Sequence, residues 1–362
     1  MSLPDNKKFL NAFLCVPGVG YETMSRLKKF FPSYETAWQS DTRGFKAADI
    51  QEKTIEAITR TKARINPDDE MTRLIKGNVT LLTDNEPDFP ELLREIHSPP
   101  MWLYIKGGTN LNSVSLAVVG SRKATSYGRE ATKNIIAGLS ELTDITITSG
   151  LAMGIDAQAH ISSLKHSLPT IAVVGTGLDR QSFFPPKNIR LAEEIISRGG
   201  AVISEYPLGT PALKHNFIQR NRVISGLAKG ALIVEAAEKS GALITARFAL
   251  EQGREVFVVP GSIFSPYSRG VNALLKEGAT PVSSATDIAD ELNLPQKTLA
   301  PNARTILTNE NEKNILKTLL EPLGVDEMQK KSGISIPDII SCLSMLELKG
   351  LVKNMRGEWT KI

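Results

Sequence analysis

The chain has 362 residues, of which 41% are apolar and 23% charged, with 43 Lys and Arg against 39 Asp and Glu. This composition excludes a wholly disordered or collagen-like chain, and the length indicates two or three domains. The net charge of +4 is small, but residues 96–290 alone carry 19 basic and 15 acidic side chains. Such an excess indicates a polyanionic partner only if the basic side chains converge on one face.

Residues 1–76 predict a domain of short helices, because apolar side chains recur at helical spacing within residues 9–14, 24–31 and 50–58. The sequence VPGVG at residues 16–20 lies between the first two helices. It is similar to the hairpin of a helix-hairpin-helix element, whose backbone amides can contact phosphates. An ordinary helix–helix turn fits these five residues equally well.

The section from residue 77 to residue 290 begins with a turn-rich lead segment and then alternates short apolar runs with helix-like stretches, such as residues 129–142 and 242–252. The runs are continuously apolar, which is typical of parallel strands covered on both faces. We therefore predict an α/β domain with a doubly wound parallel sheet. Its six strands are expected at residues 116–119, 145–148, 171–174, 201–203, 232–234 and 256–259.

Residues 291–308 contain turn residues and little periodicity, which predicts a linker. Residues 309–362 resemble a small winged-helix domain with three helices and two strands that turn at Arg356 and Gly357. The third predicted helix lacks Arg and Lys until Lys349, although direct base reading usually needs such side chains. A partner-binding or dimer-related role is therefore favoured for this domain.

Cysteine and histidine are too sparse for a metal or disulfide framework. Cys15 and Cys342 lie in opposite terminal segments, and none of the four histidines belongs to a CxxC or HExxH pattern. The first residues lack the apolar stretch of a signal peptide, and no run approaches the roughly 18 apolar residues of a membrane span. We expect a reduced, soluble, cytoplasmic protein without a metal, a cofactor or a membrane contact.

Ligands of open parallel sheets bind beyond the carboxyl ends of the strands, so the residues that follow each strand are informative. Glycines and hydroxyls follow the first three predicted strands, and Gly150, Gly154 and Gly175 would let the backbone approach an anion. None of these loops matches GxGxxG or GxxxxGK[ST], which argues against a nicotinamide cofactor and a P-loop nucleotide. The glycines could equally serve tight turns between strands and helices.

Two basic clusters belong to this section. Arg122 and Lys123 follow the first strand directly, where a guanidinium suits a phosphate, although an ion pair with a neighbouring carboxylate is the alternative. In the second cluster, stacking and cationic groups occur within about two helical turns, a combination that suits single-stranded nucleic acid. Alternatively, its aromatic ring belongs to the core and its arginines are solvated. This basic stretch covers residues 214–222, and the side chains that carry the interpretation are Phe217, Arg220, Asn221 and Arg222.

Catalytic groups are few. Asp156 and His160 share a helix face and could form an acid–base pair, but a capping Asp beside a packed His fits as well. Glu205 and Glu235 end strands, where a carboxylate could bind a ribose hydroxyl. Without a metal motif or a second matched carboxylate, we expect neither to be catalytic.

Several motifs occur in the order found in the bacterial DNA-processing protein A family (DprA, also called Smf), which the chain resembles over most of its length. The motifs are AVVGSRK at residues 117–123, SGLAMGID at 149–156, SEYP at 204–207, RNR at 220–222, SGALITA at 240–246 and VPG at 259–261. The resemblance implies an N-terminal domain similar to a sterile alpha motif, an extended Rossmann-like domain and a C-terminal winged-helix domain.

The resemblance further implies a non-catalytic homodimer that binds and protects single-stranded DNA and loads the RecA recombinase in natural transformation and homologous recombination. Ser121 and Arg122 match the family's GSR pocket, residues 220–222 match its RNR element, and Phe217 matches the preceding aromatic. Two departures stand out. Phe217 is followed by Ile and Gln rather than Pro, and Met153 replaces an Arg that many members carry, which removes one possible phosphate contact.

Two other functions stay open at this point. One is hydrolysis of the N-glycosidic bond of nucleoside monophosphates on a related Rossmann fold, but the sequence PGS at residues 260–262 lacks the Pro-Gly-Gly-x-Gly-Thr loop of those enzymes. The other is a structural adaptor that acts through the winged helix. The adaptor predicts that residues 1–290 alone bind no DNA.

Overall fold

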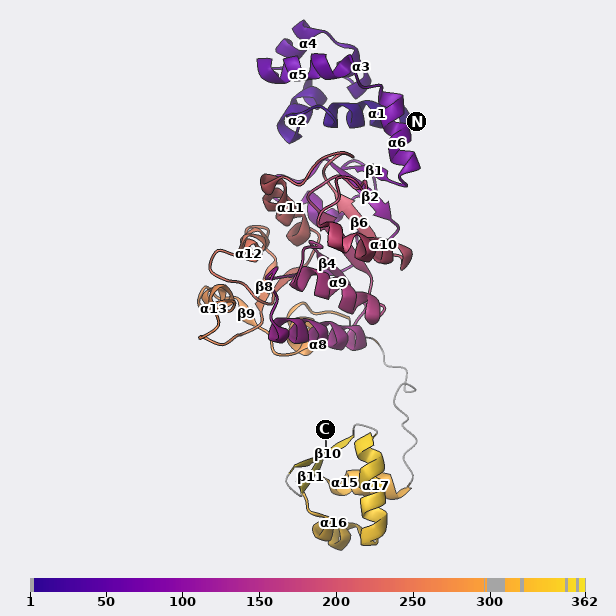
Figure 1. The fold of residues 1–362 in the computed structure, drawn as a ribbon, viewed down its shortest axis with the longest axis vertical. Helices are drawn as coiled ribbons and strands as arrows, with labels where there is room; N and C mark the ends of the chain where they lie inside the picture. Colours follow the sequence, from indigo (N-terminus) through magenta and orange to yellow (C-terminus); the bar gives the residue numbers. More distant parts are fainter. Residues whose placement is uncertain are drawn as a thin grey trace. The chain divides into compact units, whose positions relative to one another are not determined.

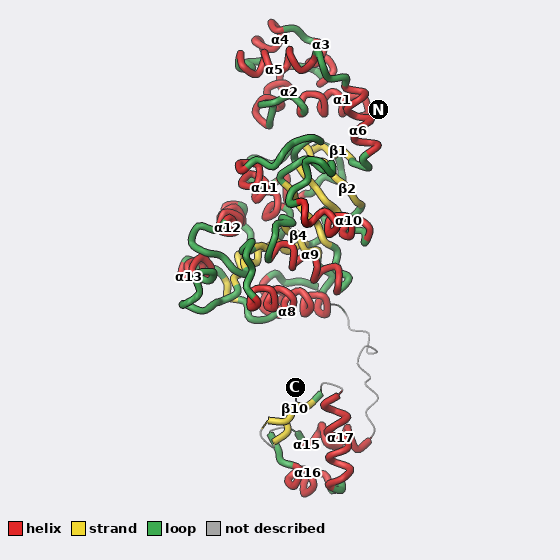
Figure 2. Tube along the Cα trace, viewed as in Figure 1, coloured by secondary structure: helices red, strands yellow, loops and turns green. Residues whose placement is uncertain are grey.

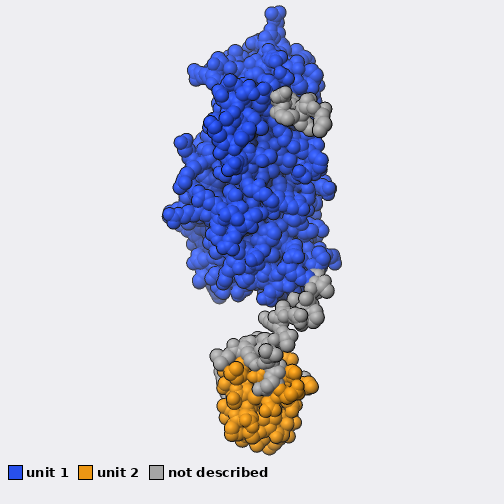
Figure 3. All heavy atoms as spheres, turned by 90° about the vertical axis from the view of Figure 1, so that its right-hand side faces the viewer, with its two compact units in different colours: residues 1–297 blue, residues 298–362 orange. Residues whose placement is uncertain are grey.

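The computed structural model describes residues 3–295, 297, 310–319, 322–348, 351–355 and 358–361. The chain divides into two compact units, residues 1–297 and 298–362, which Figure 3 shows in blue and orange. Most of the predicted linker, and the predicted turn at Arg356 and Gly357, lie outside the described residues.

The first unit begins with six helices, and α3, α4 and α6 start at local side-chain caps. The Ser33 hydroxyl accepts a hydrogen bond from the Thr36 amide, and the Asp41 carboxylate accepts one from the Gly44 amide. Such caps satisfy amides that the first turn of a helix leaves without partners. The helices are α1 (Leu3–Leu14), α2 (Tyr21–Phe30), α3 (Tyr34–Gln39), α4 (Thr42–Ala47), α5 (Glu52–Lys62) and α6 (Pro67–Lys76).

A mostly parallel sheet follows, with the strand order β1-β2-β6-β5-β4-β3-β7-β8-β9. Strands β3 to β8 lie within two residues of the six predicted strands, and all pairings among them are parallel. The edge pairings β1–β2 and β2–β6 are antiparallel. The strands are β1 (Thr80–Thr83), β2 (Trp102–Gly107), β3 (Ser115–Val119), β4 (Thr146–Ser149), β5 (Thr170–Val174), β6 (Ala201–Ser204), β7 (Gly230–Ile233), β8 (Glu255–Val258) and β9 (Thr280–Pro281).

Helices cover both faces of this sheet, as Figures 1 and 2 show, so the predicted doubly wound α/β fold is confirmed. Along β3, Leu116 and Val118 pack into one apolar cluster with α8 and α9, whereas Ala117 and Val119 pack into another with α11 and α12. Alternating side chains of a strand point to opposite faces, so both faces are buried. The helices are α7 (Glu91–Arg94), α8 (Ser126–Leu142), α9 (Ile155–Lys165), α10 (Ile189–Ser197), α11 (Lys214–Gly226), α12 (Gly241–Glu251), α13 (Arg269–Lys276) and α14 (Ala285–Glu291).

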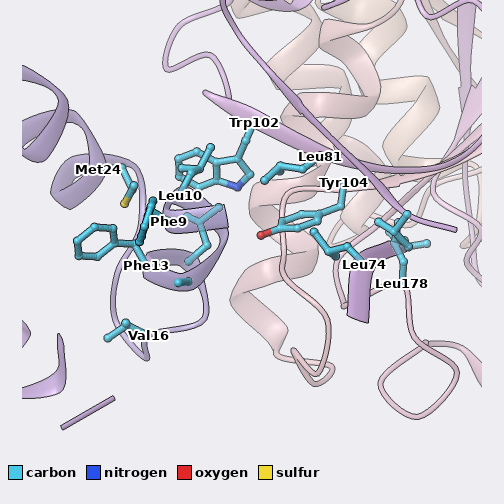
Figure 4. Packing of buried hydrophobic residues seen from close by; sticks show 14 of the residues in the cluster. Phe9, Leu10, Phe13, Val16, Met24, Leu74, Leu81, Trp102, Tyr104 and Leu178 are labelled. Atoms are coloured by element: carbon cyan, nitrogen blue, oxygen red, sulfur yellow. The ribbon is translucent and has the colours of Figure 1, made fainter. Parts of the chain in front are cut away.

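The N-terminal helices share one apolar cluster with strands β1 and β2 of the sheet. Figure 4 shows Phe9 and Phe13 of α1 in this cluster together with Trp102 and Tyr104 of β2. The buried Tyr104 hydroxyl donates a hydrogen bond of 2.8 Å to the Asn11 side chain of α1. The helices and the sheet therefore bury their apolar surfaces against each other.

The described part of the second unit contains three helices and two antiparallel strands, in the order expected for a winged helix. Its apolar core includes Ile315, Met328, Leu343 and Val352. The elements are α15 (Glu310–Thr318), α16 (Val325–Ser332), α17 (Ile336–Leu348), β10 (Val352–Met355) and β11 (Glu358–Lys361). In neither unit does a described helix combine the length and the apolar character that crossing a bilayer requires.

Candidate nucleic-acid interface

A cleft of about 790 Å³ lies where the strand order reverses. Strand β3 pairs with β4 on one side and with β7 on the other, so the loops after β3 and β7 diverge at this point. In open α/β sheets this reversal is the usual place for a ligand. The cleft is lined by the β3–α8 loop, by helix α11 and by the start of α12.

The charge of the cleft is strongly one-sided. Among the described residues that line it, five are cationic and Asp156 is the single carboxylate. Four of the cations are exposed, so they can reach a ligand without losing all of their hydration. A concave surface with this excess attracts a polyanion. The cationic residues are Arg122, Lys123, Lys214, Arg220 and Lys239.

Aromatic rings lie beside these cations, namely Phe217, Phe184 and the half-buried Tyr267. The half-buried Phe217 ring of α11 lies 6.0 Å from the Arg122 guanidinium carbon, measured to the ring centroid. A second ring, Phe184 of the β5–α10 connection, lies 5.6 Å from Phe217 between centroids, at an interplanar angle of 55°. The structure thus brings together Arg122 and Phe217, two side chains that the sequence placed in separate clusters.

Arg220 is buried and binds the backbone beneath the cleft. Its Nη1 donates to the Gly150 carbonyl at 2.6 Å and to the Val173 carbonyl, and Asp156 lies nearby. Burial lowers the pKa of Arg220 to about 10, while Asp156 acts in the opposite direction, so the guanidinium stays charged at neutral pH. Burial likewise raises the pKa of Asp156, and Arg220 opposes this shift.

The rest of the RNR element divides between two environments. Asn221 lines the cleft and donates a hydrogen bond of 3.3 Å to the Gly241 carbonyl of α12. Arg222 is absent from the cleft wall, and its Nη2 lies 2.5 Å from Glu205 Oε1, with both side chains 13% exposed. Arg220 and Asn221 thus line the cleft as buried side chains that bind backbone carbonyls, whereas Arg222 pairs with Glu205.

The predicted glycines are close-packing positions beneath the cleft rather than part of its wall. A Cβ at Gly150 would lie 2.7 Å from both terminal nitrogens of Arg220, and one at Gly175 would lie 3.1 Å from the Phe217 ring. Gly154 has a φ of +87°, and a Cβ there would lie 2.2 Å from the Ser121 carbonyl oxygen. These positions keep the β3–α8 loop, the Arg220 guanidinium and the Phe217 ring in place.

The family model of DNA recombination-mediator protein A matches residues 80–293, which is more than half of the chain. The chain belongs to this family. The resemblance drawn from the motifs is therefore confirmed, and the cleft lies inside the matched segment.

Relatives of the recombination-mediator family match much of the chain. Protein Smf of Synechocystis is 34% identical, covering 94% of this chain and 95% of its own length. Protein Smf of Escherichia coli is 38% identical over 80% of this chain and 79% of its own. DNA processing protein DprA of Streptococcus pneumoniae is 43% identical over 56% of this chain and 71% of its own.

Two solved structures of the same family are similar in fold. The X-ray structure of DprA from Streptococcus pneumoniae superposes with a TM-score of 0.66 at 32% identity, covering 78% of this chain and 97% of the other. A structure of DNA processing protein A from Helicobacter pylori, which concerns its single-stranded DNA binding mode, gives a TM-score of 0.53 at 28% identity. It covers 59% of this chain and 95% of the other.

In this family member, the side chains considered for catalysis have structural partners. His160 is fully buried, its Nδ1 lies 2.7 Å from the Thr170 hydroxyl, and burial together with Arg220 lowers its pKa to about 3. Asp156 accepts hydrogen bonds from backbone amides instead. Among the described residues, no group of three His, Cys, Asp or Glu side chains could hold a metal ion.

The two carboxylates that end strands are also engaged. The buried Glu235 accepts hydrogen bonds from the Thr125 amide at 3.0 Å and from the Thr125 hydroxyl at 2.5 Å. Glu205 pairs with Arg222, as described above. Both side chains therefore stabilise loops at the sheet edge.

Four charged or aromatic residues of the cleft were missed from the sequence, namely Phe184, Lys214, Lys239 and Tyr267. Lys214 belonged to the predicted basic stretch but was not singled out, and Lys239 follows the β7 strand end by only a few residues. Phe184 lies ten residues after β5, beyond the segment in which loop residues were sought. Its position before two prolines was the available signal, because prolines fix the backbone next to an exposed ring.

Proposed function

We propose that this protein binds single-stranded DNA in the cleft, with little sequence preference, and acts as a DNA-processing and recombination-mediator protein in transformation. The carrying observation is that four exposed cations and the Phe217 and Phe184 rings line one cleft at the reversal of the strand order. Cations bind the phosphates of any sequence, and aromatic rings stack any exposed base. The relatives' names and the Helicobacter pylori structure support this role.

The proposal gives the predicted site residues different tasks. Arg122 and Lys123 contact phosphates, Phe217 stacks a base, and Ser121 and Asn221 supply hydrogen bonds. Arg220 and Arg222 position α11, because their guanidiniums bind protein groups. Gly150, Gly154 and Gly175 permit the close packing beneath the cleft.

Single strands are favoured over duplexes because of the rings. A duplex hides the faces of its bases within the stack, whereas an unpaired base offers its face to an aromatic side chain. Exposed cations alone would bind both forms of DNA. The proposed preference for single strands therefore depends on the aromatic part of the cleft.

The finer parts of the proposal rest on family membership. We infer that the protein is not an enzyme, acts in the cytoplasm as a homodimer, protects incoming DNA and loads RecA onto it. We further infer domains at residues 1–76, 77–290 and 309–362, joined by a linker at 291–308. Loading is tested by whether the protein lets RecA displace a single-strand-binding protein from DNA, and dimerisation by sedimentation equilibrium.

A binding titration tests the central proposal. Wild type and Arg122→Ala are titrated with a labelled single strand and with the matching duplex, at several salt concentrations. Arg198→Ala serves as the control, because Arg198 is exposed on the surface and lies outside the cleft wall. We expect tighter binding of the single strand, and a loss of about tenfold in Arg122→Ala, or about 1.4 kcal/mol. The proposal is contradicted by an affinity that does not change with salt concentration, or by an affinity of Arg122→Ala equal to that of wild type.

A further inference from the structure

Phe184 is a large apolar side chain that the fold leaves in the open. It is 40% exposed and lines the cleft, whereas the adjacent Phe183 is 8% exposed and packs into the core. Burying a phenylalanine is favourable by about 1.5–3 kcal/mol, so an exposed ring at the wall of a basic cleft is a feature to explain. Exposed apolar surface rimmed by polar groups marks contact sites.

The segment that carries Phe184 is held on both sides. Before it, the Asp179 carboxylate accepts hydrogen bonds from the Ser182 amide at 3.1 Å and hydroxyl at 2.5 Å, and from the Gly209 amide at 2.6 Å. After it, the Asn188 side chain donates a hydrogen bond of 2.8 Å to the Leu151 carbonyl. The ring is therefore presented by a fixed loop, and little ordering is needed when a ligand binds.

The geometry relative to Phe217 suits two bases rather than one. The ring centroids are 5.6 Å apart and the planes are inclined by 55°, so the rings are not stacked face to face. Successive bases along one strand of a duplex rise by about 3.4 Å. Two bases that each cover one of these rings would therefore be spread apart, as in a stretched single strand.

We infer that Phe184 stacks a second unpaired base beside the base on Phe217, so that the affinity of the cleft depends on bases as well as on phosphates. This inference rests on the proposed function. It assigns Phe184 a direct contact with the ligand, and it makes the two rings one platform with the cations around it. A strand without bases has the same phosphates but nothing to place on the platform.

The test compares two single strands of equal length and charge, ten thymidines and ten abasic sites. Phe184→Ala should bind the thymidine strand more weakly by between about fivefold and about 150-fold, the range that alanine substitution gives for one stacked base. Its affinity for the abasic strand, and the salt dependence of both affinities, should equal those of wild type. Phe184→Tyr should restore binding, because tyrosine keeps the aromatic face.

The control is Phe264→Ala, since Phe264 is 89% exposed and lies outside the cleft wall. It should bind both strands like wild type. An equal loss on both strands in Phe184→Ala, or no loss on either, overturns the inference. Failure of the wild type to bind any single strand would instead overturn the proposed function, so the two outcomes are distinct.

Discussion

The pair formed by Glu205 and Arg222 lets the anchoring of α11 be tested separately from DNA binding. Their charged atoms lie 2.5 Å apart, and each side chain is 13% exposed. Removing one partner of a buried pair leaves the other charge uncompensated and costs about 3–5 kcal/mol, whereas replacing both by apolar residues is often close to neutral. We expect Glu205→Met and Arg222→Met each to lower the unfolding free energy by about 3 kcal/mol, the low end of this range. The double variant should lower it much less.

The two single variants should differ in their pH dependence. Burial raises the pKa of Glu205, and Arg222 partly opposes this effect. In Arg222→Met the opposing charge is gone, so the native carboxyl binds a proton at a pH where the unfolded one is still ionised. Stability then rises as the pH falls, by up to about 1.4 kcal/mol per pH unit, until the unfolded carboxyl also protonates. The guanidinium left in Glu205→Met stays charged, so its cost should stay constant.

Urea unfolding followed by tryptophan fluorescence at pH 8, 6.5 and 5 measures these free energies. Trp102 is a suitable reporter, because its indole donates a hydrogen bond of 2.8 Å to the Glu205 carbonyl. The four proteins form a double-mutant cycle, and its coupling energy should be about 5 kcal/mol at pH 8, because two single losses of about 3 kcal/mol exceed the small loss of the double variant. The reasoning is refuted if each single variant lowers the unfolding free energy by less than about 1 kcal/mol. It is also refuted if the destabilisation by Arg222→Met does not change with pH.

Three further predictions follow from the site. Gly150→Ala should lower the unfolding free energy, measured in urea, by about 1–3 kcal/mol, because the added Cβ would clash with Arg220. Gly241→Ala is the control and should change it little, because a Cβ there has no atom within 4 Å. The pKa of His160 is about 3 in the folded protein and ordinarily 6.5. As the pH falls from 6.5 towards 3, the imidazole is protonated in the unfolded chain only, so the unfolding free energy of wild type should fall by about 1.4 kcal/mol per pH unit. His160→Gln should lack that part of the loss, and equal pH slopes would contradict the prediction. Lys214→Ala should reduce the slope of log affinity against log salt by about 0.7 on single strands, and an unchanged slope would exclude a phosphate contact.

The central strands were predictable because each is a continuous apolar run that ends in small or polar residues. The strands at the sheet edges were not. Strand β2 begins two residues after a pair of prolines, and β9 consists of Thr280 and Pro281 only, so neither has the pattern of an independent strand. Their pairing is determined by contacts with distant segments, which a local pattern does not contain.

The site likewise contains residues that a local pattern reveals and residues whose environment depends on distant segments. Arg122 was found because it directly follows a predicted strand, and Phe217 because it stands among cations. The burial of Arg220 depends on Gly150 and Asp156, which come from a loop and a helix more than sixty residues earlier. One local sign was present: Arg220 stands one turn before the apolar Val223 and Ile224, which places it on the buried face of α11.

The outer strands of the sheet also limit aggregation. An exposed sheet edge is a template on which a strand of another molecule can pair. Here β9 contains two residues and ends in Pro281, which has no amide hydrogen to donate to an incoming strand. At the opposite edge, β1 contains four residues and contacts α6. Copies of the protein at high local concentration are therefore protected against joining sheet to sheet at the β9 edge.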